Sequence, residues 1–146
     1  MREGPHAYGL EQHLVADFLW SLCLDSYVYG ITGISTEFNY QSGRTDIVAR
    51  TFEGEIIAFE AKLTRWKVAL NQAYRNRCFA HRSFVVLPER TAHIALKNSK
   101  EFVSRNVGIV AVSGQSHYDC VLEASVSHPC LGWLTQKALA ATTDWT

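Results

Sequence analysis

Hydrophobic and polar residues repeat along the chain with two different periods. In residues 9–23 the apolar positions recur at helical spacing, which predicts an amphipathic helix. Shorter segments at 35–41, 44–51 and 55–63 alternate with a period of two, as half-buried strands do. The first half of the chain is therefore expected to form one helix followed by three strands.

In the second half, expected helices and strands follow one another. Residues 66–80 are rich in Ala, Leu, Arg and Gln, which favour a helix. The other elements expected here are strands at 83–88, 107–113 and 118–126, and helices at 91–105 (interrupted near 98–99) and 131–141. This order predicts an α/β fold with a central mixed β-sheet flanked by helices.

Length and composition indicate one globular domain over residues 1–146. Apolar residues make up 47% of the chain, enough for a substantial core. No segment approaches the roughly 18 consecutive apolar residues of a membrane span, so no membrane partner is expected. The N-terminal sequence lacks the apolar run of a signal peptide, which predicts a cytoplasmic location.

One expected strand, at 55–63, has an unusual second face. Alternate residues from Ile57 to Leu63 form an apolar face, whereas the other face begins apolar and ends with Glu60 and Lys62. A solvated sheet face would be polar along its whole length. The charged pair at the end of this strand is therefore a candidate for chemistry.

The apolar pattern also predicts how this strand pairs with the one before it. A three-residue loop ending at Gly54, in the left-handed conformation that such loops favour, sets Ile47 opposite Phe59. The same register sets Asp46 directly opposite Glu60. A two-residue loop would place apolar residues against polar ones, which the pattern disfavours.

Opposed carboxylates repel one another unless something positive lies between them. Lys62 is one candidate, and a hard divalent cation such as Mg²⁺ is the other. A lysine beside such a cation can orient or deprotonate an attacking water. The alternative is a structural ion cluster at the edge of the sheet.

The stretch GRTDIVARTFEGEIIAFEAKL resembles the active-site hairpin of the PD-(D/E)xK nuclease superfamily, which has the restriction-endonuclease-like fold. The resemblance covers roughly residues 9 to 88. It implies that Asp46 and Glu60 bind Mg²⁺, with Mn²⁺ as a substitute, and that Lys62 activates water.

The resemblance also implies roles for two helical residues. Gln72 occupies the place of a glutamine found near the site in many members, and Glu11 is similar to a glutamate on the first helix that joins the metal site. Each is equally compatible with an ordinary residue at the edge of the core. Two positions depart from the pattern: Thr45 precedes Asp46 where proline is frequent, and Asn76 stands where some branches have tyrosine.

The charge is unevenly distributed along the chain. Residues 1–61 hold three basic and nine acidic residues, whereas residues 62–106 hold ten basic and two acidic ones, an excess of eight positive charges. Such a block indicates an anionic partner, and nucleic acid, with DNA favoured over RNA, fits the resemblance. The expected nucleic-acid contacts are Arg44, Arg65, Lys67, Arg75, Arg77 and Arg82.

A zinc site is a separate possibility. His117, Cys120, His128 and Cys130 are ligand types, but the gap between the two pairs is short and strand-like. Ordinary core and loop positions are the alternative.

Together these features predict a Mg²⁺-dependent endonuclease or exonuclease with weak sequence specificity or recognition by shape. The alternative is a nucleic-acid-binding or assembly module that keeps the fold without cutting. The apolar helix at 131–141 could pair two copies in a homodimer, or could pack on its own sheet.

Overall fold

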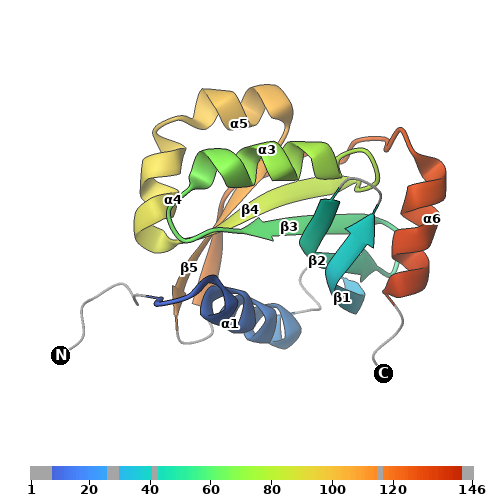
Figure 1. The fold of residues 1–146 in the computed structure, drawn as a ribbon, viewed down its shortest axis with the longest axis horizontal. Coiled ribbons are helices and arrows are strands. Elements are labelled where there is room, and N and C mark those ends of the chain that lie inside the picture. The colour runs from blue at the N-terminus through green and yellow to red at the C-terminus, as the bar shows by residue number, and fades with distance from the viewer. Residues whose placement is uncertain (1–7, 26–29, 41–42, 115–116, 143–146) are drawn as a thin grey trace.

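The computed structural model describes residues 8–25, 30–40, 43–114 and 117–142. Its centre is a six-stranded sheet in which the order of the strands follows the chain (Figure 1). The strands are β1 (Ile31–Tyr40), β2 (Gly43–Thr51), β3 (Ile56–Ala61), β4 (Arg82–Pro88), β5 (Gly108–Gly114) and β6 (His117–Leu122). The helices are α1 (Glu11–Leu24), α3 (Trp66–Asn76), α4 (Glu89–Leu96), α5 (Ser99–Arg105) and α6 (Gly132–Ala141). No helix within the described ranges is long and apolar enough to cross a membrane.

The sheet is mixed. Strands β1 to β3 form an antiparallel meander, β3, β4 and β5 are parallel neighbours, and β6 returns antiparallel to β5. Parallel neighbours need crossover connections, which α3 provides between β3 and β4, and α4 with α5 between β4 and β5. The α/β fold expected from the sequence is confirmed.

Helices cover both faces of the sheet. Helix α1 lies on one face, where Phe18 packs edge-on against Phe59 of β3 with ring centroids 5.0 Å apart. Helices α3, α4 and α5 lie on the opposite face (Figure 1). Because side chains alternate along β3, Phe59 points toward α1 and Ala58 toward the other face. The same alternation directs Glu60 toward α3.

Some element ends differ from the sequence expectation. Strand β3 ends at Ala61 instead of residue 63, and β6 at Leu122 instead of 126. Helix α3 ends at Asn76 instead of residue 80. Immediately after Asn76, the backbone N–H groups bond to carbonyls three residues back, in a tightened turn that buries Phe79.

Helix α6 packs on the sheet of its own chain, which was one of the two arrangements expected for it from the sequence. Leu134 and Ala138 are buried in a cluster with Phe38 of β1 and Val48 of β2. Trp133 of this helix is 58% exposed, and the homodimer stays a prediction.

Candidate active site

The β2–β3 hairpin has the predicted register. Ile47 pairs with Phe59 and Val48 with Ala58. Gly54 has φ +85°, and its N–H donates to the Thr51 carbonyl at 2.9 Å, which closes the three-residue loop. The next position along the pairing belongs to Asp46 and Glu60, so the two carboxylates meet where the regular ladder ends.

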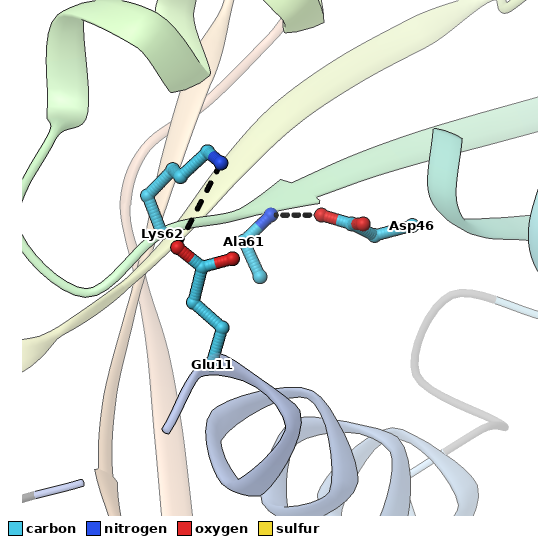
Figure 2. Close-up of polar contacts among 4 residues, drawn as sticks. All are labelled: Glu11, Asp46, Ala61 and Lys62. Carbon is cyan, nitrogen blue, oxygen red and sulfur yellow. Dashed lines mark hydrogen bonds and ion pairs between the residues drawn. The ribbon is translucent and has the colours of Figure 1, made fainter. Parts of the chain in front are cut away.

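Asp46 takes the place of a backbone acceptor at this point. Its Oδ2 accepts the Ala61 N–H at 2.8 Å (Figure 2). In a regular antiparallel pair this N–H would bond to a carbonyl of the facing strand. The substitution fixes the direction of the Asp46 side chain at the end of β3.

An irregularity in β1 accompanies this change. Ile34 packs with the α1-side core, whereas Phe38 packs with the cluster under α6. Between them Glu37 has φ +55°, a left-handed conformation that is uncommon outside glycine. In β2, Thr45 bonds to helix α3 although Ile47, two residues on, faces α1. Near Asp46, alternate residues of both β1 and β2 therefore switch from the α1 side of the sheet to the α3 and α6 side.

Glu60 is 2% exposed and is held by an amide from α3. Asn76 Nδ2 donates to Glu60 Oε2 at 2.8 Å. Asn76 Oδ1 accepts hydrogen bonds from Thr45 Oγ1 at 2.8 Å and from the Tyr40 hydroxyl at 3.2 Å. Because the amide oxygen already faces two hydroxyl donors, the amide nitrogen must face Glu60.

The surroundings of Glu60 disfavour its charge. Burial raises the pKa of the Glu60 carboxyl to about 8, and the hydrogen bond from Asn76 opposes that rise. The neighbouring Asp46 raises the pKa further, both through its charge and through a hydrogen bond, while Lys62 lowers it. Glu60 therefore favours its protonated form near neutral pH.

Lys62 lies one residue beyond β3. Its backbone N–H still bonds to the Val86 carbonyl at 3.2 Å. Its ammonium group lies 3.7 Å from Oε2 of Glu11, in the first turn of α1 (Figure 2). The sequence had placed Lys62 beside Glu60 on one strand face; in the structure its ion pair is with Glu11.

The two carboxylates offer ligands that suit Mg²⁺. Asp46 bonds to the Ala61 N–H through Oδ2, and Glu60 bonds to Asn76 through Oε2. A cation bound here would replace the hydrogen bond between the two carboxyl groups. Hard oxygen donors of this kind are what Mg²⁺ prefers. Among the described residues no three His, Cys, Asp or Glu side chains are close enough to form a metal site, so Glu11 does not join the pair in this conformation.

Gln72 and Asn76 lie one turn apart on α3, and of the two only Gln72 was expected to have a role at the site, which stays a prediction. The Gln72 side-chain oxygen is buried and has no hydrogen-bond partner within the described part of the chain. Asn76, interpreted only as a departure from a pattern, makes the contact with Glu60. The four-residue spacing was the available signal, since it places both amides on the same side of the helix.

The predicted nucleic-acid contacts are unequal in exposure. Those fully exposed on or beside α3 are Arg65, Lys67 and Arg75. Arg77 is half-buried and donates from Nη1 to the Arg105 carbonyl at 3.0 Å, and Arg82 is also half-buried. Arg44 lies 3.7 Å from the exposed Glu37.

The four candidate zinc ligands, His117, Cys120, His128 and Cys130, do not lie together in one cluster. Cys120 on β6 packs against the core on the α1 side. His128 and Cys130 instead line a groove beside Cys78, near the end of α3. In the regions that the structure describes, no cluster of three such ligands occurs.

The core of the α/β fold consists of a helix, an antiparallel three-stranded meander, a crossover helix and a parallel strand. The paired carboxyl groups of Asp46 and Glu60 lie where β2 meets β3.

A solved structure shares the fold over most of both chains. The structure is similar to SPO1766, a protein of unknown function from Silicibacter pomeroyi, with a TM-score of 0.60 and 15% identity over 90% of this chain and 84% of that one. Weaker similarity links it to SfsA from Pyrococcus furiosus in complex with Ca²⁺ (TM-score 0.49, 13% identity, 86% and 69% coverage). A repair endonuclease from Pyrococcus abyssi is similar at a comparable level (TM-score 0.47, 16% identity, 75% and 50% coverage). No protein-family model and no curated protein sequence matches the chain.

Proposed function

We propose that this protein is a Mg²⁺-dependent nuclease that hydrolyses phosphodiester bonds, with DNA favoured over RNA as the substrate. The supporting observation is the contact between Asp46 and Glu60 at the end of the hairpin. Within the described ranges, no lysine or arginine forms an ion pair with either carboxylate. A structural ion cluster would pair them with a cationic side chain, whereas a metal-binding pair leaves their oxygens available.

Each polar residue of the site has a separate task in this proposal. Asp46 and Glu60 hold the cation, which supplies Lewis acidity at the scissile phosphate. The Lys62 ammonium group orients the attacking water and offsets negative charge on the phosphate, and Glu11 holds that group at the edge of the site. Asn76 is a positioning residue, since its side-chain amide donates a hydrogen bond that fixes the orientation of the Glu60 carboxyl group.

Cleavage assays with single-stranded and duplex DNA and with RNA, in Mg²⁺, Mn²⁺ or EDTA, test the proposal. Lys62→Ala should lower the rate by roughly 10²- to 10³-fold, the usual cost of removing one group that stabilises charge in the transition state. Its stability should change by less than about 1 kcal/mol, because the ion pair with Glu11 is partly exposed. Added Mn²⁺ should raise the melting temperature of the wild type and of Lys62→Ala, but not of Asp46→Asn.

Two results would count against the proposal. Cleavage by Asp46→Asn at the wild-type rate would remove the metal assignment. Nucleic-acid binding by the wild type without any cleavage would instead favour a module that has the fold but does not cut.

A further inference from the structure

A groove of about 500 Å³ opens at the C-terminal end of α3, a volume typical of small-ligand sites. One wall is the end of this helix, and the other is the segment that enters α6. The Leu131 N–H donates to the Cys78 carbonyl at 2.9 Å and holds the two walls together. The lining residues are Tyr40, Tyr74, Arg75, Arg77, Cys78, His128 and Cys130.

The chemistry of the lining selects for a particular kind of ligand. Two guanidinium groups and an imidazole line the groove, and no carboxylate among the described residues does. Tyr74 is 48% exposed and presents a ring on the rim. The Arg77 guanidinium lies 5.8 Å from the centroid of that ring and is tied to the Arg105 carbonyl, so the cationic wall is fixed in place. A ligand with a flat aromatic group and a phosphate matches both features.

The groove is connected to the candidate active site. Tyr40 belongs to its lining, and the Tyr40 hydroxyl donates to Asn76 Oδ1. Asn76 in turn donates to Glu60. One buried amide therefore separates the groove from the metal-binding carboxylate, on the same face of the sheet.

We infer that this groove binds an unpaired nucleotide of the substrate strand, with its base on Tyr74 and its phosphate at Arg75. The inference rests on the proposed nuclease function and narrows its substrate. A base within a duplex keeps its own stacking partners, whereas an unpaired base can stack on an aromatic side chain. The substrate class is therefore a single strand, or a duplex with a single-stranded end.

Fluorescence anisotropy in EDTA separates binding from cutting. The probes are a labelled single-stranded DNA and a blunt duplex of the same sequence, each titrated with the full chain. Tyr74→Ala should weaken single-strand binding by roughly fivefold to a hundredfold, the range for loss of one stacked base. Tyr74→Phe should restore it, and duplex binding should change less than about twofold.

Trp20→Ala is the matched control. Trp20 is 61% exposed on α1, on the other face of the sheet, so its loss should leave single-strand binding unchanged. Equal affinity of wild type and Tyr74→Ala for the single strand would overturn the inference. Displacement of the strand by an equal concentration of free mononucleotide would overturn it too, by identifying a site for a small molecule.

The two proposals fail separately. If Tyr74→Ala loses single-strand binding but the wild type cuts no substrate in any metal, nucleotide binding in the groove is supported and the nuclease assignment is wrong. If cutting depends on Lys62 while Tyr74→Ala binds the single strand normally, the nuclease assignment is supported and the inference about the groove is wrong.

Discussion

Glu60 is a carboxyl group buried beneath α3, where a neutral amide and a second carboxyl are its closest polar partners. A charge in such a place is stable only when a cation compensates it. Without one, the site favours a proton. Binding of a metal at this carboxyl group would therefore be coupled to loss of the proton.

This coupling predicts how stability varies with pH in EDTA. The folded Glu60 keeps its proton up to about pH 8, whereas the unfolded chain releases it near pH 4.5. The folded state binds more protons across that window, so the free energy of unfolding should fall as pH rises from 4.5 to 8. Thermal melts of wild type and Glu60→Gln should diverge over this window, with the wild type losing more stability. Parallel curves would contradict the raised pKa.

Asp46 should be a source of strain in the metal-free protein. At pH values above about 8 both carboxylates carry charge, and Asp46→Asn removes the repulsion while its Oδ1 can still accept the Ala61 N–H. Above about pH 8 in EDTA, the variant should be more stable than the wild type by about 0.5–2 kcal/mol, a common stability–activity trade-off. Asp46→Ala, which leaves the Ala61 N–H without its acceptor, should gain less. A lower melting temperature for Asp46→Asn than for the wild type above about pH 8 would support a structural ion cluster instead.

At the scale of the element, the β2–β3 hairpin sets the site, because its register brings the two carboxylates together. Gly54 has φ +85°, and no atom lies within 4 Å of the position that a Cβ would take. A side chain there is therefore disfavoured by the left-handed backbone conformation and not by a clash with neighbouring atoms. Gly54→Ala should therefore destabilise the protein by about 1 kcal/mol. Gly132→Ala, at the start of α6 with equally open space and no positive φ, is the matched control. Chemical denaturation should show a lower free energy of unfolding only for Gly54→Ala. Equal effects of the two substitutions would mean that the left-handed conformation at Gly54 does not contribute to the stability of the hairpin.

Helix α3 is the second element that organises the site, since it has two functional faces. Its inner face brings Asn76 to Glu60. Its outer face carries the exposed Lys67, Tyr74 and Arg75. A nucleic-acid strand lying along the outer face would pass close to the carboxylates without disturbing the core.

At the scale of the whole molecule, charge is distributed so that the chain is neutral overall but basic around α3. Each phosphate contact contributes a slope of about −0.9 in log affinity against log salt for duplex DNA. Arg65→Gln with Lys67→Gln should therefore flatten the slope by about one to two units. Lys97→Gln with Lys100→Gln, the same charge change on the α4–α5 segment, should leave it nearly unchanged. Equal effects of the two pairs would indicate long-range attraction in place of contact at α3.

The sequence by itself determined the elements and the pairing of the central hairpin. Period-two alternation assigns each residue of β2 and β3 to a face, and a one-residue slip would bury the polar set. Together with the turn at Gly54, this was enough to place Asp46 against Glu60. Element ends were less predictable, because residues such as Phe79 are buried by a tightened turn that has no period of its own.

Only the tertiary structure decided what surrounds that pair. Tyr40 and Thr45 donate from two strands to Asn76 on α3, and Asn76 in turn donates to Glu60. Lys62 forms its ion pair with Glu11 of α1. Periodicity reports which face of its own element a residue occupies. It carries no information on which residues of different elements meet, since that depends on the crossing of α3 over the sheet and on the reversal of faces near Glu37.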